Sequence, residues 1–140
     1  MNIFLDSSAL AKRYVQEVGS DRVEECLRSA TSLGISVLAT PEVISALCRL
    51  HREKTLSRKQ YLKAKEALFE DIVDVRIIQI TDDVTTRTVE LLERFSLRSA
   101  DALHIASAAE WAADYFISAD QRQCAAARGY GLKVKELPQD

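Results

Sequence analysis

Short apolar runs alternate with longer helical patterns from one end of the chain to the other, and this alternation restricts the possible folds more than any other feature. Five of these runs have the length of strands, and they are Ile3–Leu5, Ile35–Ala39, Val75–Ile80, Tyr115–Ser118 and Leu132–Leu137. Strands that alternate with helices are typical of an α/β fold, because a parallel strand needs a crossover connection to reach its neighbour. We therefore predict an α/β fold with a mainly parallel, five-stranded sheet.

The segments between these runs have apolar residues at helical spacing and polar residues that suit helix ends. The expected helices are Ser8–Val15, Ser20–Ala30, Pro41–Lys54, Ser57–Asp74, Asp82–Phe95, one capped by Ser99, and an Ala-rich one that follows Asp120 and ends at Gly129. No repeat or linker interrupts the pattern, so we expect residues 1–140 to form a single domain.

Composition and charge narrow the class of protein. A net charge of −2 gives no overall attraction for nucleic acid, so any such contact must come from local clusters of basic residues. Cys26, Cys48 and Cys124 lack metal-ligand spacing, which predicts reduced thiols and fits a cytoplasmic protein. No apolar run is long enough to span a bilayer and the N-terminus does not read as a signal peptide, so we expect no membrane contact.

Acidic residues follow three of the predicted strands. Asp6 comes directly after the first strand, Glu42 follows the second and Asp120 follows the fourth. The carboxyl ends of parallel strands meet at one edge of a sheet, which is where ligands bind in open α/β folds. A single Asp there would most simply cap the next helix, but three acids at one edge predict a site. The placement of Asp101, which opens the helix leading into the fourth strand, stays open from topology alone.

Carboxylates gathered in one cleft repel each other, and a bound divalent cation would compensate their charge. Hard oxygen ligands without His or Cys partners favour Mg²⁺ or Mn²⁺. The sequence thus predicts a site for Mg²⁺ (or Mn²⁺) at this edge of the sheet.

Four segments spread over nearly the whole chain share motifs with one family of nucleases, and they are Phe4–Lys12, Pro41–Arg49, Ser99–Ala106 and Ile117–Asp120. Through them the chain resembles the PIN-domain nucleases, and more closely the VapC-like ribonuclease toxins of toxin–antitoxin pairs. The resemblance implies a three-layer α/β/α sandwich that is often dimeric. It also implies an acidic quartet of Asp6, Glu42, Asp101 and Asp120.

The chemistry that the resemblance implies is metal-assisted hydrolysis of RNA phosphodiester bonds. Asp6, Asp101 and Asp120 would hold one or two metal ions, while Glu42 would orient a water molecule. The implied partners are an RNA substrate, a cognate antitoxin that covers the acidic residues and the neighbouring helical hairpin, and a second copy of the chain in a homodimer.

Four further side chains have both a functional and a structural interpretation. Ser7 and Ser118 would hydrogen-bond the carboxylates from behind, or would only cap helices. Arg49 would contact substrate phosphate, or would pair with an acid at the surface. His104 lies on an Ala-rich helix, where a hydrogen-bonded packing role suits it better than that of a general base.

Basic residues are concentrated between Arg49 and Lys65, where only Glu53 opposes them. They are Arg49, Arg52, Lys54, Arg58, Lys59, Lys63 and Lys65. This stretch is either a solvated helical surface or a contact for a phosphate backbone.

Other classes of function fit parts of the pattern. A haloacid-dehalogenase-like phosphatase also begins with a strand that ends in Asp, but it needs a second Asp two residues later, where this chain has Ser8. A housekeeping PIN-like nuclease would cleave RNA without acting as a toxin, and a catalytically silent α/β binding module would not cleave it at all. Assays of RNA cleavage and of phosphate release separate these classes.

Overall fold

The computed structural model describes residues 1–138, so Gln139 and Asp140 of the predicted 1–140 domain lie outside the described residues. The strands are β1 (Asn2–Leu5), β2 (Ser32–Ser36), β3 (Arg76–Ile78), β4 (Tyr115–Ser118) and β5 (Val134–Glu136). The helices are α1 (Ser7–Ala11), α2 (Ser20–Leu27), α3 (Ala39–Arg52), α4 (Arg58–Asp71), α5 (Asp82–Arg94), α6 (Ser99–Glu110) and α7 (Gln121–Gly129).

The five strands form one sheet in the order β3-β2-β1-β4-β5, and every neighbouring pair is parallel. The first strand of the chain is therefore the central one, and the chain reverses its direction of winding at β1. This arrangement confirms the predicted α/β fold with a five-stranded parallel sheet. It also places the carboxyl ends of all five strands at one edge, with the β1 end in the middle.

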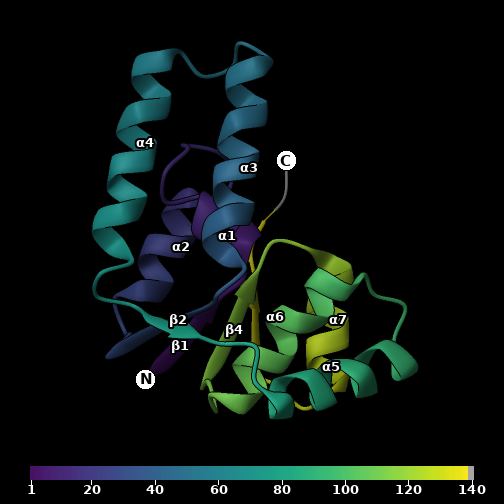
Figure 1. Cartoon of the computed structure of the whole chain (residues 1–140). Helices are drawn as coiled ribbons and strands as arrows, with labels where there is room; N and C mark the ends of the chain where they lie inside the picture. The colour runs from purple at the N-terminus through teal and green to yellow at the C-terminus, as the bar shows by residue number, and fades with distance from the viewer. Residues whose placement is uncertain (139–140) are drawn as a thin grey trace.

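Helices cover both faces of the sheet, which confirms the three-layer α/β/α sandwich (Figure 1). Ile3 and Leu5 pack on one face with residues of α1, α2, α3 and α4, whereas Phe4 packs on the other with residues of α5, α6 and α7. This alternation follows from the two-residue period of a strand. Phe4 also stacks on Phe116 of β4, with ring centroids 5.8 Å apart.

The second strand is Ser32–Ser36, so the predicted range Ile35–Ala39 was wrong at both ends. The chain leaves the sheet after Ser36, whose Oγ accepts a hydrogen bond from the backbone N–H of Leu38, and α3 begins at Ala39. The strand begins early because Ser32 and Leu33 pair with β1 despite the weak strand propensity of the segment.

The strand also includes Gly34, where a Cβ would lie 2.5 Å from the Trp111 ring. Its lack of a side chain therefore lets the C-terminal end of α6 approach the sheet.

Several predicted helix ends also needed correction. The first helix stops at Ala11 instead of Val15, and its N-cap is Asp6, which receives a hydrogen bond from Ala9 N–H. Ser99 does not cap α6, because Arg98 is the N-cap and makes no side-chain cap. The glycine with a left-handed backbone after α7 is Gly131, at φ 104°, and Gly129 lies inside the helix.

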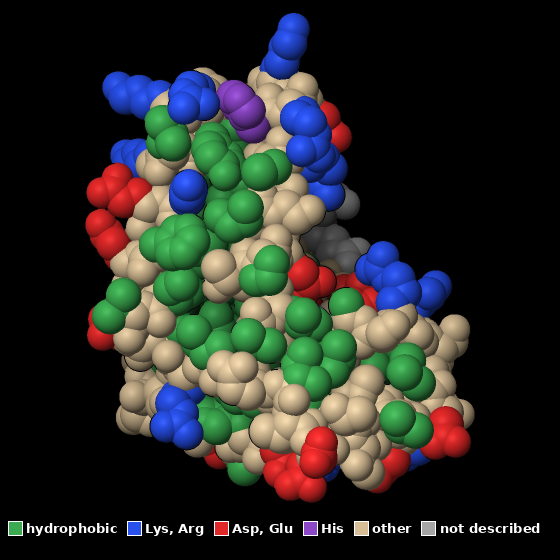
Figure 2. Space-filling view, in the orientation of Figure 1, with side chains coloured by type: hydrophobic (Ala, Val, Ile, Leu, Met, Phe, Trp, Pro, Cys, Tyr) green, Lys and Arg blue, Asp and Glu red, His purple; other side chains and the backbone are tan. Residues whose placement is uncertain are grey.

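The helices α3 and α4 form a hairpin that extends away from the sheet (Figure 1). The predicted start of α4 is confirmed, since Ser57 and Gln60 form a reciprocal capping box. Lys and Arg side chains gather at the far end of this hairpin, and apolar side chains cover the face below that end (Figure 2).

The three cysteines are free thiols, as predicted. Among residues 1–138, no helix has the length and apolar character needed to cross a membrane.

Candidate active site

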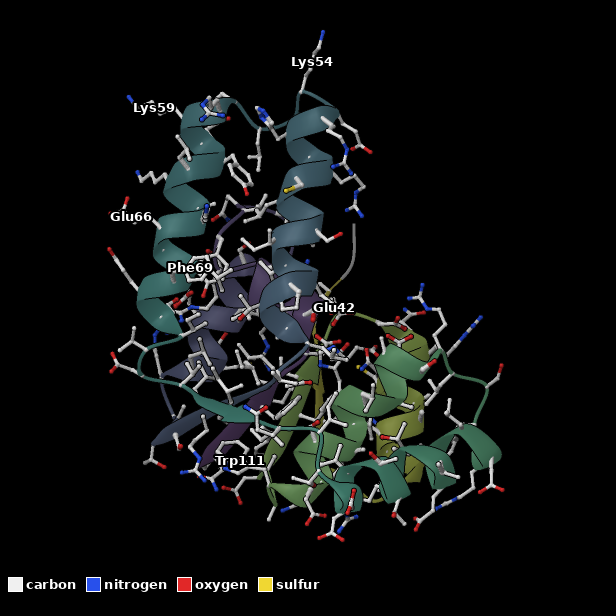
Figure 3. All side chains as sticks on the ribbon, viewed as in Figure 1. Glu42, Lys54, Lys59, Glu66, Phe69 and Trp111 are labelled. Carbon is white, nitrogen blue, oxygen red and sulfur yellow. The ribbon has the colours of Figure 1, made fainter. Side chains whose placement is uncertain are left out.

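A cleft of about 430 Å³ lies at the carboxyl edge of the sheet, between the base of the α3–α4 hairpin and the N-terminal ends of α6 and α7. All four predicted acids line it, so the structure brings Asp6, Glu42, Asp101 and Asp120 to one place. We call this region the acidic cleft. Glu42 projects from the base of α3 toward the N-terminal end of α6 (Figure 3).

Asp6 forms the floor of the acidic cleft and is 2 % exposed. Its Oδ1 accepts hydrogen bonds from Ala9 N–H (2.9 Å) and Ser8 Oγ (2.7 Å), and its Oδ2 accepts one from Ser118 Oγ (2.6 Å). Burial raises the pKa of the Asp6 carboxyl, and the hydrogen bond from Ser118 offsets this only in part. Asp6 thus combines burial with neutral hydrogen-bond donors and, within residues 1–138, has no ion-pair partner.

Glu42 lies in the first turn of α3, where Ser7 of α1 and His104 of α6 both reach it. Its Oε1 accepts hydrogen bonds from Ser7 Oγ (2.6 Å) and from His104 Nε2 (2.5 Å). Burial alone would raise the pKa of Glu42, but the bonds from His104 and Ser7 outweigh it and hold the pKa below its ordinary value. Glu42 is therefore ionised at neutral pH.

Asp101 and Asp120 occupy the opposite wall at the starts of α6 and α7. Asp101 accepts a hydrogen bond from Arg98 Nε (3.3 Å), while Asp120 caps α7 through the backbone N–H of Gln123 (3.1 Å). The Gln123 side chain donates to the backbone carbonyl of Asp101 and so ties the two helices together. The same Ser118 that contacts Asp6 accepts a bond from Asp120 N–H, which links both acids to the end of β4.

Two arginines border the acidic cleft. Arg49 of α3 lines it two turns after Glu42, and Arg98 lines the α6 side. The other basic residues of the hairpin, including Lys54 and Lys59 at its tip, do not line the cleft (Figure 3). The predicted basic region therefore divides into one arginine at the cleft and a group that faces solvent.

The donor chemistry of the acidic cleft suits a hard divalent cation, because its acidic side chains supply oxygen ligands. Within residues 1–138, however, no three His, Cys, Asp or Glu side chains form a ready-made metal-binding group. Asp6 and Asp120 also cap helices, and Glu42 is held by Ser7 and His104. Mg²⁺ keeps several of its waters in proteins and needs only one or two carboxylates, so this arrangement is compatible with it.

A comparison with protein-family models matches residues 3–129 to the PIN domain, which is most of the chain. The chain belongs to the PIN-domain family. The ribonuclease VapC46 of Mycobacterium tuberculosis (strain ATCC 25618 / H37Rv) is 32 % identical to this PIN domain over 134 residues, which cover 94 % of the chain and 95 % of the relative. The PIN fold and the VapC-like resemblance predicted from the motifs are thus confirmed.

Solved structures share the fold of this PIN domain at low sequence identity. VapC20 of Mycobacterium tuberculosis, described as a sarcin–ricin loop cleaving toxin, superimposes with a TM-score of 0.69 at 18 % identity and covers 98 % of this chain and 99 % of its own. VapBC2 of Rickettsia felis, bound to a promoter DNA fragment, gives a TM-score of 0.69 at 15 % identity, with coverage of 97 % and 98 %. These likenesses concern the fold.

Several polar side chains in the acidic cleft of the PIN domain were not predicted as site residues. Among them are Ser8, Arg98, Gln123 and His104. Ser8 could have been found from its place beside Asp6 and Ser7, but nothing in the local sequence indicates that Gln123 reaches the backbone of Asp101. The packing role expected for His104 is correct in that it is buried and hydrogen-bonded, yet its partner Glu42 places it in the cleft.

Proposed function

We propose that the acidic cleft hydrolyses RNA phosphodiester bonds with the help of Mg²⁺ or Mn²⁺, and that the protein is the endoribonuclease toxin of a toxin–antitoxin pair. The observation that carries this proposal is the set of acidic side chains that line one cleft, Asp6, Glu42, Asp101 and Asp120. The ribonuclease name of a relative that matches 94 % of the chain supports it.

The proposed roles follow the wall on which each acid lies. Asp6, Asp101 and Asp120 surround the end of β4 and would hold the cation, which when bound activates water and offsets charge on the phosphate. Ser118 would keep Asp6 oriented through its hydrogen bond to Oδ2. Glu42, ionised and facing them from α3, would accept a proton from the attacking water.

Arg49 is the proposed contact for a substrate phosphate. It lies on the same helix as Glu42 and lines the cleft, so its guanidinium is within reach of a phosphate next to the acids. Arg98 could serve the opposite side, because its pairing with Asp101 is exposed to solvent and is weak.

The proposed partner is an antitoxin that covers the acidic cleft and the α3–α4 hairpin. Solved structures with this fold include a toxin–antitoxin complex from Klebsiella pneumoniae and VapBC-5 of Mycobacterium tuberculosis, described as a member of the VapBC family of toxin–antitoxin systems. Large apolar side chains on α4 and at the β3 edge are exposed, and they offer a surface for the proposed antitoxin or for a homodimer (Figure 2). They are Leu62, Phe69, Val73, Ile77 and Ile80. The free thiols fit the reducing cytoplasm, where we place the protein.

A catalytically silent binding module is the alternative, and the lack of a ready-made three-residue metal group within residues 1–138 favours it. The deciding experiment incubates the purified protein with RNA and, separately, with small phosphate monoesters, in Mn²⁺ and in chelator. The proposal predicts cleavage of RNA that requires Mn²⁺ and stops with chelator. Phosphate release from monoesters would indicate a phosphatase, and no reaction in either assay would favour the silent module.

A further inference from the structure

Three elements of the sandwich converge on one oxygen atom. Oε1 of Glu42, from α3, accepts hydrogen bonds from Ser7 of α1 and from His104 of α6. The His104 side chain is only 3 % exposed, while that of Glu42 is 37 % exposed. A buried ring thus holds a carboxylate that faces the cleft.

The contact between the ring and the carboxylate requires a hydrogen on one particular ring nitrogen. An ionised carboxylate accepts hydrogen bonds and cannot donate them, so the hydrogen in the Glu42 contact must lie on His104 Nε2. The other ring nitrogen, Nδ1, is buried and has no hydrogen-bond partner within residues 1–138. Nε2 is therefore the ring nitrogen on which the contact with Glu42 depends.

We propose that His104 is a positioning residue for the nuclease reaction, which fixes Glu42 by donating from Nε2 to Oε1 and leaves Oε2 directed to the reacting water. Within residues 1–138, Oε2 of Glu42 accepts no hydrogen bond, in contrast to the doubly bonded Oε1. This inference rests on the proposed function, because it assigns Glu42 to the water. His104 itself does not touch the substrate.

A positioning role for His104 depends on the hydrogen-bond donor at Nε2, whereas a packing role depends on the whole ring. Glutamine can place its amide N–H₂ near the position of Nε2, whereas the shorter asparagine reaches only as far as Nδ1. His104→Gln therefore keeps a donor for Glu42, and His104→Asn removes it. Both variants lose the ring, so a role confined to packing predicts similar losses for the two.

The first experiment measures kcat/KM for RNA cleavage in Mn²⁺, with thermal melts to confirm that each variant is folded. We expect His104→Asn to lower kcat/KM by about 100-fold, since misplacing a catalytic group by about 1 Å costs that much, and His104→Gln to stay within about tenfold of the parent. The loss should lie in kcat. Equal losses in both folded variants, or no loss in His104→Asn, would overturn the proposal.

A double variant tests whether His104 acts through Glu42. Once Glu42→Gln has removed the carboxylate, adding His104→Asn should change kcat/KM by less than about threefold, because the two residues then share one role. A further 100-fold loss in the double variant would show that His104 acts on something else and would contradict the inference.

The third measurement needs neither RNA nor metal. A ¹⁵N NMR spectrum of the imidazole nitrogens at about pH 7 should show a hydrogen on Nε2 of His104, with His51→Gln used to assign the two rings. A bare Nε2 would overturn the proposal. A parent protein that fails to cleave RNA, yet carries this hydrogen on Nε2, would refute the proposed nuclease function while the hydrogen-bond assignment stands.

Discussion

Asp6 is the residue at which the electrostatic cost of the acidic cleft is highest. It is buried against neutral donors, and that burial raises the pKa of its carboxyl above the ordinary value of 3.8. Asp101, by contrast, has an arginine beside it, and Glu42 has two hydrogen-bond donors on one oxygen. A bound divalent cation would therefore offset the cost of ionising the buried Asp6 carboxyl.

The pH dependence of stability tests this view. With a raised folded-state pKa, the folded protein binds more protons than the unfolded chain above about pH 4, so stability falls as the pH rises through that window. The free energy of unfolding of the parent minus that of Asp6→Asn should therefore decrease between about pH 4 and pH 7 in chelator. Denaturant titrations at several pH values measure it. A difference that rises with pH would mean that Asp6 is stabilised as an anion without metal.

Sequence patterns predicted that three acids, Asp6, Glu42 and Asp120, follow strand ends that meet, because a parallel topology fixes which ends of the strands meet. The place of Asp101 came only from the family resemblance. Sequence patterns could not predict His104 as the partner of Glu42, since these residues are 62 positions apart and meet only when α3 and α6 pack. A capping role was predicted for Asp6, as the alternative to a site role, and none was predicted for Asp120. Both acids nevertheless combine a cap with a place in the cleft.

At the scale of elements, the α3–α4 hairpin separates two kinds of basic residue. Arg49 lines the acidic cleft, whereas Arg58 and Lys59 lie at the other end of the hairpin and are exposed. Of the clustered charges, Arg49 is thus the one that lines the cleft, and it is also the one for which the sequence had suggested a phosphate contact.

RNA binding at different salt concentrations distinguishes these charges. Arg49→Gln should reduce the salt slope of binding by about 1, because one phosphate contact is lost, and it should weaken binding to all sequences alike. The matched control, Arg58→Gln with Lys59→Gln, should leave the slope unchanged. Equal reductions per charge in both variants would show that RNA lies along the whole hairpin, and an unaltered slope for Arg49→Gln would remove it from the substrate contact.

Sequence patterns also did not predict the contact between β2 and α6. This contact is made by Gly34, whose missing side chain leaves room for the Trp111 ring. We expect Gly34→Ala to destabilise the protein by about 1–3 kcal/mol, because its methyl group would overlap the indole ring. Trp111→Leu in the same chain should recover part of this loss, which a double-mutant cycle of unfolding free energies measures. Additive effects of the two substitutions would contradict the proposed contact.

If the whole protein is a toxin, RNA cleavage by its acidic cleft should stop the growth of the cell that makes it. Expression of the parent chain alone should arrest bacterial growth, while Asp120→Asn made at the same level should not, because the arrest depends on cleavage. Growth curves with matched protein levels provide the measurement. Normal growth with abundant, catalytically intact parent protein would favour a housekeeping nuclease over a toxin.

A Mn²⁺ titration of RNA cleavage with the parent and Asp120→Asn tests whether the acidic cleft is a metal-dependent nuclease centre. Asparagine can still cap α7 through its side-chain oxygen, so the variant should fold, but it loses a charged ligand. We expect cleavage by the parent to rise with Mn²⁺ and to vanish with chelator, and cleavage by the variant to be on the order of 100-fold lower. Cleavage that is indifferent to chelator, or equal in both proteins, would show that the acidic cleft is not such a centre.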